Sequence, residues 1–284
     1  MDVIVADNAG FCFGVKRALE LAARAAEDPA RDVYTLGPLI HNPQEIARLE
    51  EQGIHSVDTL DRVGAGVLLL SAHGVDPEVE EAARASGAQV IDATCPFVQR
   101  AHQHIGTLAE AGYAVVILGD KGHREVTGLA ALAGGKADIV TSASETQALP
   151  FRECCGLVVQ TTQRPETLHD VVAALAGRCR ELRVFNTICE ATLKRQQSAR
   201  ELAGQVDVML VVGGRNSANT ARLGEICAET GTPTHHIETA QELHADWFRG
   251  ASRAGVTAGA STPEWIVDEV VSRLRKLPAD AHCP

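Results

Sequence analysis

The 284-residue chain lacks several features that mark whole classes of protein. It has no lysine- and arginine-rich run, and its formal net charge is −11, so nucleic acid and anionic membrane surfaces are poor candidates as partners. No basic segment precedes an apolar stretch at the N-terminus, and the longest apolar runs are far shorter than the roughly 20 residues of a membrane helix. We therefore predict a cytoplasmic protein without a signal peptide or a membrane span.

Aromatic residues are also scarce, at 4%, and no Cys-x2-Cys pair occurs. The missing pair excludes a zinc ribbon or zinc finger. Eight cysteines in an apparently cytosolic chain favour metal or redox chemistry over a disulfide framework. With 45% hydrophobic residues there is ample core material, and the length favours two or three domains.

Three cysteines share one setting in the sequence. Cys12, Cys95 and Cys189 each follow a strand-like apolar run and precede a helix-like segment. The first of these runs, Val3–Val5, is expected to be a buried strand. Backbone N–H groups at a helix start favour an anion, which lowers the pKa of a thiol and yields the thiolate that binds metals.

The spacing of these cysteines predicts tandem units. The first two cysteines lie 83 residues apart and the second two 94 residues apart, and each interval is long enough for a small α/β unit. Further strand-like runs end in polar turns, and ligands of parallel sheets bind at the carboxyl ends of the strands. We therefore expect an α/β fold of three similar small domains with mostly parallel sheets.

Three lone cysteines on separate domains suit a cubane iron–sulfur cluster with one iron open as a Lewis acid. The alternative is that each is a small buried residue at a tight turn, the common fate of a free cysteine. The repeated setting favours the cluster. Five cysteines lack the setting and are interpreted as structural: Cys154, Cys155, Cys179, Cys227 and Cys283.

Several polar residues at other strand ends are candidates for a ligand site. His41, His73 and His123 are either structural histidines or parts of a pocket for an anion or substrate. Glu125 can donate protons if burial raises its pKa, and is otherwise an ordinary carboxylate in the first turn of a helix. Four hydroxyl residues are expected to cap helices if taken singly: Thr161, Ser217, Ser261 and Thr262.

Nine short motifs, in order across nearly the whole chain, resemble those of the 4-hydroxy-3-methylbut-2-enyl diphosphate reductases, the IspH/LytB family. They are Gly10-Phe11-Cys12-Phe13-Gly14-Val15, Gly37-Pro38-Leu39-Ile40-His41-Asn42, Ser71-Ala72-His73-Gly74, Asp92-Ala93-Thr94-Cys95-Pro96, Lys121-Gly122-His123-x-Glu125-Val126, Gln160-Thr161-Thr162, Thr187-Ile188-Cys189-x-Ala191-Thr192, Asn216-Ser217-x-Asn219 and Thr257-Ala258-Gly259-Ala260-Ser261.

The resemblance implies a pseudo-threefold trefoil of three α/β domains around a central 4Fe–4S cluster. The implied cluster ligands are Cys12, Cys95 and Cys189. We predict the domain boundaries at residues 13–94, 95–188, and 189–284 together with 1–12.

The resemblance also implies the last step of the non-mevalonate isoprenoid pathway, a two-electron reductive dehydroxylation that yields isopentenyl and dimethylallyl diphosphate. The substrate hydroxyl would bind the open iron, and Glu125 would supply protons with help from Thr161 and His123. A ferredoxin or flavodoxin would deliver the electrons singly. The residues implied to bind the substrate are His41, His73, His123, Thr161, Ser217, Asn219 and Ser261.

Two positions depart from the usual motifs of the family. Ala218 stands where a second serine is usual, and Arg124 replaces a proline between the histidine and the glutamate. These departures leave open a paralogue that reduces a related allylic diphosphate. A third hypothesis is an iron–sulfur sensor without turnover. The presence of Glu125 disfavours this hypothesis, because sensing requires no proton donor.

Overall fold

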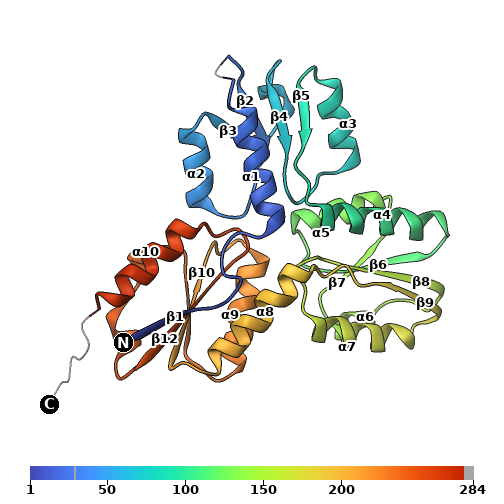
Figure 1. Ribbon diagram of the computed structural model, residues 1–284. Coiled ribbons are helices and arrows are strands. Elements are labelled where there is room, and N and C mark those ends of the chain that lie inside the picture. Colours follow the sequence, from blue (N-terminus) through green and yellow to red (C-terminus); the bar gives the residue numbers. More distant parts are fainter. Residues whose placement is uncertain (29, 278–284) are drawn as a thin grey trace. The chain divides into compact units, whose positions relative to one another are not determined.

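The structure is a computed structural model that describes residues 1–28 and 30–277, so that Cys283 lies outside the described residues. The described strands form three sheets of four strands, and every paired strand runs parallel to its neighbour. Helices connect the strands (Figure 1). The predicted α/β class with three small parallel sheets is thereby confirmed.

The first sheet has the strand order β3-β2-β4-β5. Its strands are β2 (Val33–Leu36), β3 (Ile54–Val57), β4 (Val67–Leu70) and β5 (Gln89–Asp92). The helices of this part of the chain are α1 (Phe13–Ala25), α2 (Pro43–Glu51), the 3₁₀ turn η1 (Leu60–Arg62) and α3 (Pro77–Ala85). The central strand β4 is a fully buried run of one valine and three leucines, typical of a parallel sheet covered on both faces.

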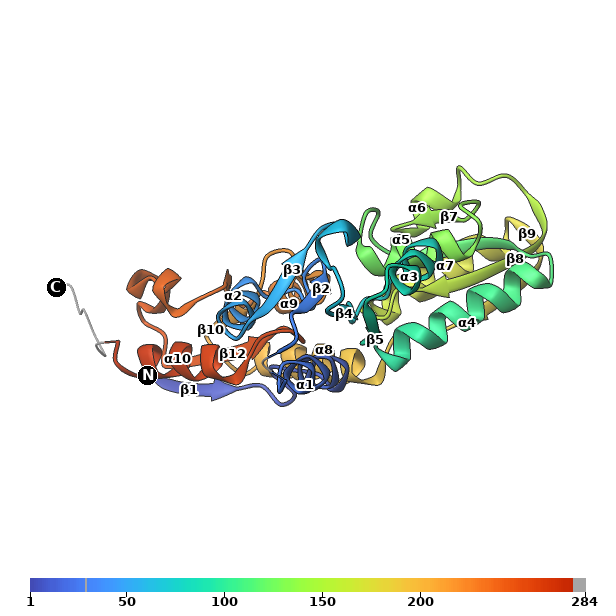
Figure 2. The same ribbon diagram turned by 90° about the horizontal axis from the view of Figure 1, so that it is seen from above.

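The second sheet repeats this topology with the order β7-β6-β8-β9. Its strands are β6 (Ala114–Leu118), β7 (Asp138–Val140), β8 (Arg152–Val159) and β9 (Cys179–Phe185). The helices are α4 (Pro96–Glu110), α5 (Arg124–Leu132), α6 (Ala143–Thr146) and α7 (Pro165–Ala176). Figure 2 shows α4 running along β8, and Val98, Ala101, Ile105 and Leu108 form its buried face.

The third sheet, in the order β1-β12-β10-β11, joins the two ends of the described chain. Its strands are β1 (Asp2–Val5), β10 (Val208–Val212), β11 (Thr234–Ile237) and β12 (Arg253–Ala258). The helices are α8 (Glu190–Ala203), α9 (Ala218–Glu229), the 3₁₀ turns η2 (Ala240–Glu242) and η3 (Ala245–Phe248), and α10 (Glu264–Arg275). Helix α10 packs against β1 and β12 (Figure 2).

The strands that lead to Cys12, Cys95 and Cys189 all lie at the edge of a sheet. They are β1, β5 and β9, and each is partly exposed. The prediction that Val3–Val5 forms a buried strand is therefore wrong in one respect. The strand exists, but Val5 is 41% exposed because β1 has a neighbour on one side only.

The chain packs as two compact units. One contains residues 1–13, 41–45 and the chain from Glu190 onward, and the other contains residues 14–40 and 46–189. The strands of each sheet fall within one predicted domain segment, but the boundaries of the three predicted domains stay a prediction. Among the described residues, none of the helices has the length and apolar character needed to cross a membrane.

Candidate functional site

Each of the three repeated cysteines is the residue directly before a helix. Cys12 precedes α1, Cys95 precedes α4 and Cys189 precedes α8. All three are half-buried and none is in a disulfide. The helix that follows starts where the sequence pattern predicts, because Pro96 pre-sets the first turn of α4 and apolar residues at helical spacing bury one face of α1.

The backbone holds the three cysteines in the same way. The edge strand that leads to each cysteine has one neighbouring strand in its sheet. The cysteine N–H donates to the carbonyl oxygen of the second residue after the end of that neighbouring strand. The pairs are Cys12 to Ala260 at 3.0 Å, Cys95 to Ala72 at 3.0 Å, and Cys189 to Thr161 at 3.1 Å. This repeated contact fixes each thiol at the carboxyl edge of its own sheet, where ligands of parallel sheets bind.

Two arginines that the sequence analysis did not single out anchor the cysteine loops. The Arg17 guanidinium, on α1, donates to the carbonyl oxygens of Thr94 (3.1 Å) and Asp92 (3.4 Å), just before Cys95. The Arg195 guanidinium, on α8, is 3% exposed and donates at 2.8 Å to the carbonyl oxygen of Gly10. The first turns of α8 are polar in the sequence, and Thr192 and Arg195 in these turns are buried. Polar residues at the start of this helix are therefore a sequence signal for an anchoring role.

Burial separates three other cysteines, Cys155, Cys179 and Cys227, from these three. Burial raises the pKa of Cys155 to about 11 and that of Cys227 to about 12, so both stay protonated thiols at neutral pH. Cys179 is buried as well, and its thiol donates to the carbonyl oxygen of Leu175. Half-buried thiols at helix starts are the better thiolate donors, and Cys12, Cys95 and Cys189 therefore fit the donor set of an iron–sulfur cluster.

In the part of the chain that the structure describes, no three His, Cys, Asp or Glu side chains form a group that could hold a metal ion. The cluster on the three cysteines therefore stays a prediction.

A buried carboxylate lies in the compact unit that contains the second sheet. Glu125, in the first turn of α5, is 1% exposed. Its two oxygens accept hydrogen bonds from the Thr161 amide (2.6 Å) and the Thr161 hydroxyl (2.8 Å). The His123 ring accepts from the Glu125 amide at 3.2 Å and meets the His73 ring edge-on, with centroids 5.8 Å apart. The structure thus brings together four of the predicted site residues.

The remaining predicted residues belong to the other compact unit. Ser217 caps α9 and accepts from the Thr220 amide at 3.3 Å, and the Ser261 hydroxyl donates to the His41 carbonyl oxygen at 2.9 Å. Asn219 is 4% exposed, and neither polar atom of its side chain has a hydrogen-bond partner among the described residues. A buried, unsatisfied amide that can both donate and accept indicates a place for a polar ligand.

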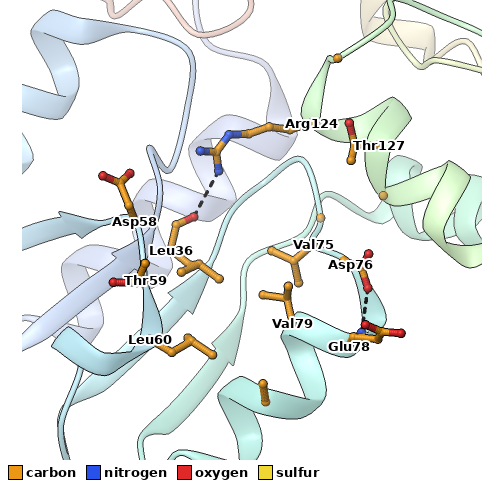
Figure 3. Close-up of a pocket in the computed structure, with 14 residues that line it drawn as sticks. Leu36, Asp58, Thr59, Leu60, Val75, Asp76, Glu78, Val79, Arg124 and Thr127 are labelled. Carbon is orange, nitrogen blue, oxygen red and sulfur yellow. Dashed lines mark hydrogen bonds between the residues drawn. The ribbon is translucent and has the colours of Figure 1, made fainter. Parts of the chain in front are cut away.

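A cavity of about 650 Å³ opens in the compact unit that contains the first and second sheets (Figure 3). Gly74 and Gly122, the sequence neighbours of His73 and His123, form part of its wall together with Arg124. The Arg124 guanidinium donates to the carbonyl oxygen of Leu36 at 3.3 Å. The unusual arginine thus has a backbone partner at the end of β2.

Comparisons with known proteins agree over nearly the whole chain. A family model described as "LytB protein" matches residues 3–275. A 4-hydroxy-3-methylbut-2-enyl diphosphate reductase of Citrifermentans bemidjiense is 50% identical over 281 residues, which cover 99% of either chain. The enzyme of the same name from Geotalea uraniireducens is 49% identical over 283 residues, which cover 99% of this chain and 100% of that one.

Solved structures show the same likeness. A reductase described as the terminal enzyme of the non-mevalonate pathway is 44% identical, with a TM-score of 0.70 over 97% of this chain and all of that chain. The E-1-hydroxy-2-methyl-but-2-enyl-4-diphosphate reductase of Plasmodium falciparum is 26% identical, with a TM-score of 0.91 over 100% of this chain and 93% of that one. The chain therefore belongs to the LytB protein family, which confirms the resemblance found in its sequence motifs.

Proposed function

We propose that this protein is a 4-hydroxy-3-methylbut-2-enyl diphosphate reductase. It would convert its substrate to isopentenyl and dimethylallyl diphosphate, as the last step of the non-mevalonate pathway. In this reaction the allylic C–O bond breaks, two electrons and two protons are consumed, a C–H bond forms and water leaves. The observation that carries the proposal is the repeated placement of Cys12, Cys95 and Cys189 before three helices, in a chain of this family.

The three thiolates would hold a 4Fe–4S cluster. When bound, this cluster would supply single electrons and an open iron that acts as a Lewis acid toward the substrate hydroxyl. The position of each cysteine directly before a helix supports this assignment, because a helix start favours an anionic group. Among the described residues, Cys155 and Cys227 are poorer donors, because burial raises their pKa values.

Glu125 would deliver protons to the reacting allyl group. Its carboxylate is held at both oxygens by Thr161, so it has one orientation, and burial keeps bulk water away from it. His123 caps the same helix through its contact with the Glu125 amide and thereby fixes the start of α5. His73, next to His123, would bind the substrate.

The diphosphate would bind to His41, Ser217, Asn219 and Ser261. Asn219 supports this role most directly, because its buried amide group has no partner among the described residues and can donate to a phosphate oxygen. Ser217 stands at the N-terminus of α9, where backbone N–H groups and the helix dipole favour an anion.

The electrons would come from a ferredoxin or a flavodoxin. The cytoplasmic location stays a prediction from the sequence.

The test is anaerobic purification, reconstitution with iron and sulfide, and assay with 4-hydroxy-3-methylbut-2-enyl diphosphate and dithionite-reduced methyl viologen. We expect viologen oxidation that depends on the substrate, with both isoprenoid diphosphates as products. An iron-loaded protein that oxidises no viologen on addition of this substrate contradicts the proposal. Turnover of another allylic diphosphate alone would identify a paralogue, and full iron content without any turnover would favour a sensor.

A further inference from the structure

A cationic and aromatic surface lies on α4 and β9, in the compact unit that contains the first and second sheets. Each of these elements is next to a proposed cluster ligand in the sequence. Helix α4 begins directly after Cys95, and β9 ends four residues before Cys189. Arg100 is five residues beyond Cys95, about 7.5 Å along the helix axis. Phe185 is separated from Cys189 by at most about 13 Å of extended chain. A surface on these two elements is therefore close to two of the three thiols.

The side chains of this surface stack on one another. The His104 ring lies over the Phe185 ring at 4.0 Å with 11° between their planes, and the Arg183 guanidinium lies 5.2 Å from the centre of Phe185. On the same helix the Arg100 guanidinium lies 6.0 Å from the centre of the Phe97 ring. Stacked arginine and aromatic groups are stiff, and partner proteins bind such groups at low entropic cost.

We call this surface the Arg100–Arg183 patch, formed by Phe97, Arg100, His104, Arg183 and Phe185. Both arginines are exposed, and the three ring side chains are half-buried. Burial lowers the pKa of His104, and the positive charges of Arg100 and Arg183 lower it further.

The patch stands out against the charge of the chain. The formal net charge is −11, yet neither Arg100 nor Arg183 forms an ion pair with a carboxylate among residues 1–28 and 30–277. Glu181, two residues from Arg183 on β9, instead accepts a hydrogen bond from the Tyr113 hydroxyl. Two exposed arginines without acidic partners, stacked on half-buried aromatic side chains, are the composition of a protein interface.

We infer that the Arg100–Arg183 patch is the docking surface for a small acidic protein that carries single electrons. This inference rests on the proposed function, which requires such a donor for each turnover. Positive charge beside the thiols would steer an acidic carrier to the edge of the protein nearest the cluster, and electrostatic steering acts mainly on the association rate. Two arginines on a strongly acidic chain are too few for stable binding of nucleic acid at physiological salt.

The test compares a protein donor with a small-molecule donor. The double variant Arg100→Glu/Arg183→Glu is reconstituted and assayed with a reduced acidic [2Fe–2S] ferredoxin and, separately, with reduced methyl viologen. We expect kcat/KM for ferredoxin to fall roughly tenfold or more, while the rate with viologen stays within twofold of wild type. Raising the salt concentration should slow the wild type with ferredoxin and affect the double variant much less.

Arg62→Glu is a single charge-reversal control, because Arg62 is an exposed arginine of η1, between β3 and β4, and it should leave both rates unchanged. Binding of oxidised ferredoxin to each protein, followed by titration, gives a readout that needs no turnover. Equal ferredoxin affinity and kcat/KM in wild type and double variant would overturn the docking surface. The docking surface would also be overturned if a DNA duplex bound the wild type more tightly than ferredoxin does and the double variant failed to bind that duplex. If the wild type shows no activity with reduced methyl viologen, the proposed function is refuted. The titration with oxidised ferredoxin would still test the patch.

Discussion

At the scale of single residues, the position of a cysteine decides which chemistry it can perform. Cys12, Cys95 and Cys189 are half-buried residues before helices, whereas burial raises the pKa of Cys227 to about 12. The first setting suits a metal ligand, and a thiol in the second stays a small apolar side chain.

We therefore predict that Cys12→Ser, Cys95→Ser and Cys189→Ser each deplete the iron and sulfide bound after reconstitution, because a hydroxyl replaces thiolate poorly in a cubane. Chemical assay of iron and acid-labile sulfide measures this. Cys154→Ser is the control and should bind as much iron as the wild type, since this thiol faces Glu181 on β9. Full iron content together with wild-type turnover in any of the first three variants would falsify the ligand assignment.

Glu125→Gln tests the proton donor. The amide keeps the shape of the side chain, so the variant should fold, bind iron and bind substrate. It can no longer deliver a proton, and a positioned general acid typically contributes about 10²–10⁴-fold to the rate, so we expect a loss of that size in kcat.

Glu81→Gln is the control, an exposed glutamate of α3 that does not line the cavity, and should leave kcat unchanged. Turnover of Glu125→Gln within a few-fold of the wild type would mean that protons reach the substrate by another route.

At the scale of elements, close contact between α4 and β8 positions the helix that follows Cys95. Gly156 lies within β8, and a Cβ atom there would lie 2.3 Å from Leu108 of α4, which is fully buried. The absent side chain therefore allows the helix to approach the sheet.

We predict that Gly156→Ala lowers the free energy of unfolding by about 1–3 kcal/mol, because overpacking forces the helix and the sheet apart. Gly224→Ala is the matched control, since Gly224 lies inside α9 with open space around its Cα. This second change should raise stability by about 0.5–1 kcal/mol, as alanine stabilises a helix interior relative to glycine. The midpoints of urea unfolding compare the two variants, and equal shifts in one direction would contradict the packing argument.

At the scale of the whole molecule, acidic residues dominate the charge, and several form hydrogen bonds that require the ionised form. Hydrogen bonds from the Arg253 amide, the Ser252 hydroxyl and the Ser252 amide lower the pKa of Asp207 below its ordinary 3.8. The Thr141 amide and Lys121 lower the pKa of Glu145 below its ordinary 4.5. A folded-state pKa below that of the unfolded chain means that the unfolded chain binds more protons at low pH.

The protein should therefore be fully stable above about pH 5 and lose stability as the pH falls through these lowered pKa values. Thermal unfolding at a series of pH values measures the loss. Asp207→Asn removes one contributing group and should flatten the decline, although protonation also reduces the self-repulsion of a chain with net charge −11. A midpoint that falls as steeply in Asp207→Asn as in the wild type would show that other groups control the acid response.

Local sequence signals predicted the elements well. Alternation of apolar runs and helical periodicity predicted parallel sheets, and the helix starts after Cys12, Cys95 and Cys189 lie where the pattern indicates. The same signals overestimated the burial of Val5, since periodicity reports which side chains are apolar and does not report whether a strand has one neighbour or two.

The sequence alone determined the α/β class, the position of Cys12, Cys95 and Cys189 before helices, and the family, because these depend on residue type, on spacing and on motifs that are contiguous in the chain. Only the tertiary structure decided that Thr161 holds both oxygens of Glu125, that Arg195 anchors the loop before Cys12, and that His104 stacks on Phe185. These partners lie between 36 and 185 residues apart, and the fold selects them through the pairing of edge strands and the packing of helices. No local pattern of side chains carries that information.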